Sequence, residues 1–139
     1  GNHRGSIFRL HVGTALLATG AWPAEIQRTW GTGTSASGQV RAAEYPLERA
    51  VSSYIGAMPF LWVEVDDLPS VASERGVIER GAVALLSNLS RDPIDPPTSG
   101  WLGRSADRPA IRHSGLWNVN HVDGRYDPLF LDVLERHVA

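Results

Sequence analysis

The sequence contains no cysteine and no lysine, so all 13 of its basic residues are arginine. Without cysteine the chain cannot form disulfides, a thiolate zinc site or a cysteine nucleophile, and it fits a reducing, cytoplasmic environment. Without lysine it can form neither a Schiff base nor the phosphate contact of a P-loop lysine. No apolar run approaches the roughly 20 residues of a membrane-spanning helix, so we expect no membrane partner.

The length and composition predict one folded domain. The chain has 139 residues, of which 42% are hydrophobic and 20% charged, and this is too apolar for a disordered chain. The net charge of −2 is unevenly divided, because residues 1–50 carry five arginines and three acids, whereas residues 51–139 carry eight arginines and twelve acids. The first part is therefore mildly basic, far below a dedicated nucleic-acid-binding domain.

Five segments have the sequence pattern of helices. The first covers residues 6–17, where Ser6 is a suitable N-cap and Gly20 a suitable stop. The others are a helix marked by Leu47, Val51, Tyr54 and Ile55, a helix with the apolar stripe Ile78, Ala82, Leu85, Leu86 and Leu89, a short helix over 107–114 with Asp107 as its cap, and a last helix after Asp127 with Phe130, Leu131, Leu134 and Val138 inward.

Two further segments complete the predicted architecture. Residues 20–43 are of low complexity, and the run of small residues over 31–38 indicates a flexible loop. Pro59 closes the second helix, and the apolar run 60–65 indicates one buried strand that ends at two aspartates. The sequence therefore predicts an α+β fold, a single helix-rich domain over residues 1–139 with a small sheet.

One carboxylate stands out on the third helix. At 100° per residue Glu79 lies about 75° from the centre of the apolar stripe, at the edge of the face that packs. A carboxylate in this position can reach a cleft, which suits a Mg²⁺ site with one protein carboxylate, water and phosphate oxygens. The alternative is an ion pair with Arg75 one turn earlier, and periodicity alone favours that pair.

A resemblance to a known family bears on this choice. The segment 78–88 resembles the last motif block of GIY-YIG nucleases, a helix that carries the metal-binding glutamate and ends near an asparagine. The preceding segment 58–65 looks like the third strand of that family's small sheet. Residues 1–13, 101–103 and 114–118 resemble a bacterial branch of GIY-YIG domain proteins, so the resemblance extends over nearly the whole chain.

The resemblance has one clear departure. The family's defining part is an N-terminal hairpin with the GIY and YIG tyrosines, followed by a helix with a catalytic arginine, and we find no such hairpin here. Tyr54, Ile55 and Gly56 spell the second triplet, but they lie at a helix end just before the expected strand. The sequence therefore resembles the C-terminal two-thirds of a GIY-YIG domain, and we expect it to be incomplete at its N-terminus.

The resemblance implies a hydrolase, a metal-dependent endonuclease acting on DNA. It assigns catalytic roles to Glu79 and Asn88 and places Mg²⁺ or Mn²⁺ on Glu79. Because the hairpin tyrosines and the arginine are missing, we expect this chain by itself to be inactive. The alternative is a non-catalytic nucleic-acid or protein interaction module.

The basic front of the chain supplies the expected DNA contacts. The candidate residues are His3, Arg4, Arg9, Arg28 and Arg41. They would bind the phosphate backbone with little sequence preference, in a salt-dependent way. We also expect the strand over 60–65 to lack its partner strands, which would leave an apolar edge open to self-association.

Overall fold

The computed structural model describes residues 1–70 and 72–138, and every regular element in that part of the chain is a helix. The elements are η1 (His3–Gly5), α1 (Ile7–Thr19), α2 (Ala24–Thr29), α3 (Gly38–Gly56), α4 (Glu74–Leu86), η2 (Leu102–Ser105), α5 (Pro109–Ser114) and α6 (Leu129–Val138). None of these helices is long and apolar enough to cross a membrane.

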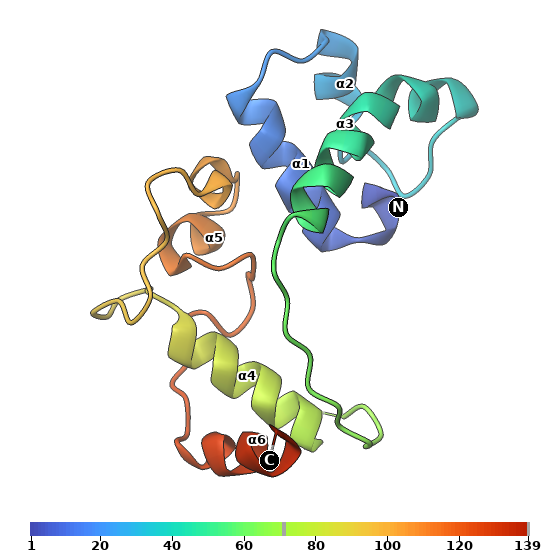
Figure 1. The fold of residues 1–139 in the computed structure, drawn as a ribbon. Helices are drawn as coiled ribbons and strands as arrows, with labels where there is room; N and C mark the ends of the chain where they lie inside the picture. Colours follow the sequence, from blue (N-terminus) through green and yellow to red (C-terminus); the bar gives the residue numbers. More distant parts are fainter. Residues whose placement is uncertain (71, 139) are drawn as a thin grey trace.

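The helices form two groups at opposite ends of the molecule (Figure 1). At the N-terminal end, η1, α1, α2 and α3 pack together around a core of Val12, Ile26, Trp30, Leu47 and Val51. At the other end α4 packs against α6. Between them, η2 packs on both α1 and α5, so the segment after α4 returns to the N-terminal helices.

The first helix is confirmed together with both of its boundaries. The Ser6 hydroxyl accepts a hydrogen bond from the Arg9 backbone N–H, and Gly20 is the C-cap residue of α1. Gly13, in the middle of α1, is buried against Trp30, and a Cβ at Gly13 would overlap the indole ring. This glycine therefore lets the tryptophan lie directly on the helix backbone.

The helix predicted around residue 47 is much longer than its apolar residues indicate. It begins at Gly38, where the Ser37 hydroxyl accepts from the Val40 backbone N–H, and it continues through Pro46. Pro46 has no N–H for the carbonyl of Ala42, but Ala42 is exposed, so water can satisfy that oxygen. The predicted low-complexity stretch also contains α2, which sequence patterning missed.

The α+β prediction is wrong, because no strand and no sheet occurs among residues 1–70 and 72–138. Residues 60–65 are extended but pair with no other segment, and Phe60, Leu61 and Trp62 are 83%, 99% and 76% exposed. A strand needs a partner for its backbone amides, and an apolar run cannot supply one. The expected self-association through a strand is wrong for the same reason.

The apolar faces of α4 and α6 differ from the predicted ones. The side of α4 that packs on α6 is built from Gly81 and Ala84, with the Phe130 ring against Gly81. The predicted stripe on α4 is half-buried or exposed, and on α6 Leu131 and Val138 are exposed. Small residues let the two helices approach closely, which a count of large apolar side chains does not predict.

The short helix after Asp107 is confirmed, with a small shift of its cap. It starts at Pro109, and Arg108 instead of Asp107 is its N-cap residue. Gly115 has φ +75° and ends the helix in the left-handed conformation, as expected of a C-terminal glycine.

The contact between Gly13 and Trp30 can be tested by substitution. We expect Gly13→Ala to destabilise the fold by about 1–3 kcal/mol, because the new methyl group forces the indole out of its place. The measurement is urea unfolding followed by tryptophan fluorescence. Gly56→Ala is the matched control, since nothing lies within 4 Å of a Cβ there, and it should raise stability by about 0.5–1 kcal/mol. Equal effects of the two substitutions would contradict the packing described.

Candidate functional site

The basic residues predicted to contact DNA lie on the N-terminal helices, where two buried carboxylates organise them. Glu44 of α3 is 1% exposed and receives a bidentate pair from Arg4. Arg4 Nη1 donates to Glu44 Oε2 at 2.5 Å and Nη2 donates to Oε1 at 2.9 Å. The second nitrogen also donates to the Thr29 carbonyl of α2 at 3.3 Å, so one guanidinium joins η1, α2 and α3.

The second carboxylate, Glu48, lies one turn further along α3 and holds two cationic side chains. The His3 backbone N–H donates to Glu48 Oε1 at 2.7 Å, and the His3 ring Nδ1 lies 2.9 Å from the same oxygen. Arg9 of α1 donates to Glu48 Oε2 through Nη2 at 2.6 Å and Nε at 3.2 Å. Glu48 therefore ties both η1 and α1 to α3.

The position of His3 is fixed on its other side as well. Its ring stacks on Trp30 at a centroid distance of 3.8 Å, and its Nε2 accepts a hydrogen bond from the Gly31 backbone N–H at 3.2 Å. Because Nε2 is an acceptor, Nδ1 carries the ring proton and donates it to Glu48. His3 is thus a fully satisfied buried side chain.

These contacts change the acidity of the carboxyl groups. The bidentate hydrogen bonds from Arg4 hold the pKa of Glu44 below its ordinary value, and the same contact raises the pKa of Arg4. Burial by itself would raise the pKa of Glu48, but hydrogen bonds from Arg9 and His3 outweigh burial and lower it. Both carboxylates are therefore charged at neutral pH and neutralise Arg4 and Arg9 within the protein.

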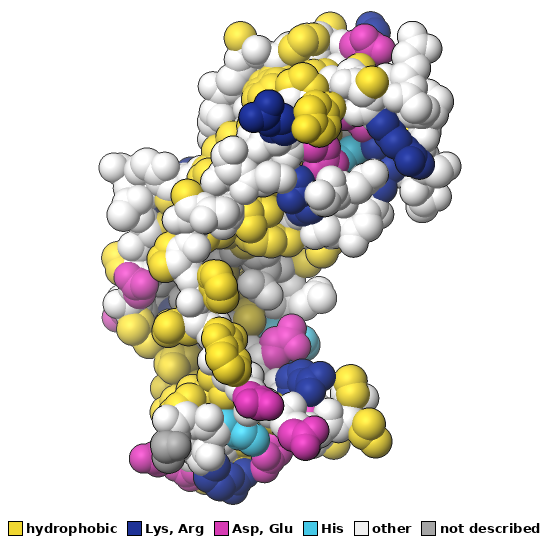
Figure 2. All heavy atoms as spheres, turned by 45° about the vertical axis from the view of Figure 1, so that its right-hand side comes forward, with side chains coloured by type: hydrophobic (Ala, Val, Ile, Leu, Met, Phe, Trp, Pro, Cys, Tyr) yellow, Lys and Arg dark blue, Asp and Glu magenta, His cyan; other side chains and the backbone are white. Residues whose placement is uncertain are grey.

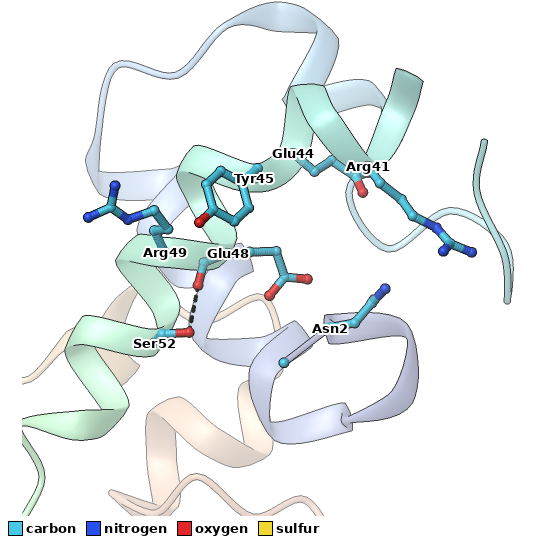
Figure 3. Close-up of a pocket in the computed structure, with 8 residues that line it drawn as sticks. Asn2, Arg41, Glu44, Tyr45, Glu48, Arg49 and Ser52 are labelled. Atoms are coloured by element: carbon cyan, nitrogen blue, oxygen red, sulfur yellow. Dashed lines mark hydrogen bonds between the residues drawn. The ribbon is translucent and has the colours of Figure 1, made fainter. Parts of the chain in front are cut away.

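Arg28 and Arg41 lie differently. Both are exposed, and neither guanidinium has a hydrogen bond or ion pair with another residue in the part of the chain that the structure describes. Arg41 borders a pocket of about 330 Å³ beside α3, together with Tyr45, Glu44, Glu48, Arg49, Ser52 and Asn2 (Figure 3). The structure thus separates the five predicted DNA contacts into three that are occupied within the fold and two that face solvent.

Glu79 is exposed on α4, and its alternative role as a partner of Arg75 is absent from the structure. Arg75 instead donates to the carbonyls of Val65 and Asp67, and it lies 3.6 Å from the Asp67 carboxylate. Glu79 lies about 150° around α4 from the residues that face α6, at 100° per residue. Its carboxylate is therefore open to ligands from solvent.

The residues around Glu79 do not form a preorganised metal site. Within residues 1–70 and 72–138, no three His, Asp or Glu side chains converge so that they could hold an ion. An isolated exposed carboxylate can supply one oxygen ligand, and the remaining positions would be filled by water and by phosphate. The structure therefore fits only an open, weak site at Glu79.

Asn88 lies apart from Glu79. At about 1.5 Å per residue, roughly 10 Å of helix runs from Glu79 to Leu86, and Asn88 follows the end of the helix. The Asn88 backbone N–H donates to the Ser114 carbonyl at 2.8 Å, and its side-chain amide donates to the Asp95 carbonyl at 3.3 Å. Its Oδ1 is buried without a donor among the described residues. Asn88 thus connects α4 to α5 and retains one free acceptor.

Sequence analysis missed the two glutamates that organise this region. Glu44 and Glu48 are one helical turn apart, so they share the face of α3 on which Leu47 and Val51 are buried. Acidic residues at the edge of a buried apolar face need cationic partners, and this was the available signal. The partners themselves are about 40 residues away in the sequence, and only the fold identifies them.

The contact between Arg4 and Glu44 predicts a pH-dependent stability. We expect Glu44→Gln to destabilise the fold by about 3 kcal/mol at neutral pH, because it leaves the Arg4 guanidinium buried without a counter-charge. Since folding lowers the pKa of Glu44, the wild type loses this stability as pH falls below the unfolded value of 4.5 and through the folded pKa.

The measurement is urea unfolding at pH 7 and at several values below 4.5, the ordinary pKa of the group. The gap between wild type and Glu44→Gln should narrow as the pH falls. Glu25→Gln removes the same charge from an exposed position on α2, and it should change stability by at most about 0.5 kcal/mol. A constant gap across this pH range would show that charge is not what Glu44 contributes.

The comparisons with known proteins agree on one family. No curated protein and no solved structure matches the chain at a significant level. The family model described as the GIY-YIG domain matches residues 1–139, which is the whole sequence. Domains of this family are in general of the nuclease type. The chain therefore belongs to the GIY-YIG family.

Proposed function

We propose that this chain is a nuclease domain that hydrolyses DNA phosphodiesters with the help of a divalent metal, and that residues 1–139 by themselves do not cleave. The observation that carries the proposal is the family match, which extends over the entire sequence. The lack of cleavage follows from the parts we do not find, since the described residues contain no strand and hence no tyrosine-bearing hairpin.

Glu79 is the proposed metal ligand. It is exposed, lies on the helix that resembles the family's glutamate block, and is not engaged by Arg75. A hard divalent cation such as Mg²⁺ or Mn²⁺ prefers oxygen ligands, and an ion bound here would neutralise charge on a phosphate. We propose Asn88 as the second catalytic residue, because its Oδ1 is an acceptor without a donor in the described structure.

DNA binding is proposed for the N-terminal helices. Residues 1–56 carry five arginines and three acids, whereas the rest of the chain is net negative. In Figure 2 arginine side chains lie over one end of the molecule, and acidic side chains gather at the end with α6. Arg28 and Arg41 are the proposed direct phosphate contacts, and His3, Arg4 and Arg9 support them by holding α1 to α3.

A second candidate function is a non-catalytic nucleic-acid-binding module of the same family. It is favoured by one observation, namely that no metal-binding cluster occurs among the described residues. Metal binding distinguishes the two functions, because a non-catalytic module retains the basic face and has no use for a metal at Glu79.

The metal proposal predicts a weak stabilisation by Mn²⁺. At ten times the dissociation constant, bound Mn²⁺ should stabilise the chain by about 1.4 kcal/mol, seen as a rise in the thermal midpoint. Glu79→Gln should remove this rise. Glu135→Gln is the control, an exposed helical glutamate on α6, and it should respond to Mn²⁺ like the wild type. Identical responses of wild type and Glu79→Gln would exclude Glu79 as the ligand.

The activity proposal predicts two results in plasmid nicking with Mg²⁺ or Mn²⁺. Residues 1–139 should not nick, because the loss of even one group that stabilises the transition state costs on the order of 10²–10³ in rate. A version with the two tyrosine-bearing strands in front of Gly1 should nick, and Glu79→Ala should abolish its activity. Glu79-dependent nicking by residues 1–139 would contradict the first result, and an inactive extended version would contradict the nuclease function.

A further inference from the structure

The outer face of α3 carries two arginines whose charges are not neutralised within the fold. Arg41 and Arg49 are exposed, and no described residue forms an ion pair or side-chain hydrogen bond with either one. The nearby carboxylates of Glu44 and Glu48 are already bound to Arg4, Arg9 and His3. Their negative charge is therefore offset from the inside, and the solvent side of α3 is left positive.

The spacing of these residues places an aromatic ring between the two charges. Arg41, Tyr45 and Arg49 follow one another at intervals of four residues, so they form one row along the helix surface. The row is about 12 Å long at 1.5 Å per residue. Tyr45 is 61% exposed, and Figure 3 shows the two arginines extending in different directions on either side of it.

The pocket beside this row is polar and has the size of a small ligand group. It measures about 330 Å³, and Asn2 and Ser52 line it together with the row. The Ser52 hydroxyl donates to the Glu48 carbonyl at 2.9 Å and accepts from Arg9 at 3.0 Å, so it is occupied. The Asn2 side-chain oxygen accepts from the Arg4 backbone N–H, which leaves its amide nitrogen as a donor toward an anion.

We propose that the row Arg41–Tyr45–Arg49 binds a single DNA strand, with an unpaired base stacked on Tyr45 and flanking phosphates on the two arginines. This inference rests on the proposed DNA-directed function and names the form of DNA. An exposed ring can stack only on a base that is free of its own neighbours, whereas the bases of a duplex are stacked inside it. The flanking guanidiniums neutralise phosphates of any sequence.

The test is fluorescence anisotropy without metal, with a short labelled oligothymidylate and a hairpin duplex of equal length. The wild type should bind the single strand more tightly. Tyr45→Ala should weaken that binding by between about fivefold and a hundredfold, the range for one stacked base, and Tyr45→Phe should retain it. Arg41→Gln and Arg49→Gln should each reduce the slope of log affinity against log salt by about 0.7.

Arg108→Gln is the matched control, because it removes an exposed arginine from the N-cap of α5, away from the row. It should change neither the affinity nor the salt slope. If the wild type binds DNA but Tyr45→Ala and Arg49→Gln bind like it, or if the duplex binds more tightly, the inference is wrong and the DNA-directed function stands. If the wild type binds neither DNA at low salt, the DNA-directed function is wrong and the inference falls with it.

Discussion

The N-terminal half of this protein depends on one layer of buried ion pairs, in which Glu44 and Glu48 of α3 bind Arg4, Arg9 and His3. The apolar core beneath it is small, and the ion pairs decide how η1 and α1 lie on α3. A buried pair costs desolvation and is stable only when its hydrogen bonds are satisfied. Here each carboxylate oxygen has a donor, and His3 is also fixed by Trp30 and Gly31.

The same layer determines the charge of the surface. Because Arg4 and Arg9 are neutralised from within, the positive field of this end of the molecule comes from the exposed arginines of α2 and α3. A glutamate substitution in the layer would thus alter both stability and nucleic-acid binding, whereas Arg49 can be changed with little effect on the fold. This separation makes binding and folding experimentally distinguishable.

The other end of the molecule has a different design. There α4 and α6 pack through Gly81 and Phe130, and Glu74 at the start of α4 binds both Arg136 and His137 at the end of α6. This pairing leaves the opposite side of α4, and with it Glu79, open to solvent. An open carboxylate on a rigid helix accords with a metal that arrives with its water and its phosphate, in a family whose domains are nucleases.

What the sequence determined by itself was local, and what the tertiary structure decided was every pairing between distant segments. The boundaries of α1 and α5 follow from Ser6, Gly20 and Gly115, because caps and left-handed glycines act within one turn. The apolar run 60–65 predicted a strand, but a strand exists only with a partner, and none is present among the described residues. Arginine positions indicated a basic front, yet only contacts about 40 residues apart decided which guanidiniums remain free.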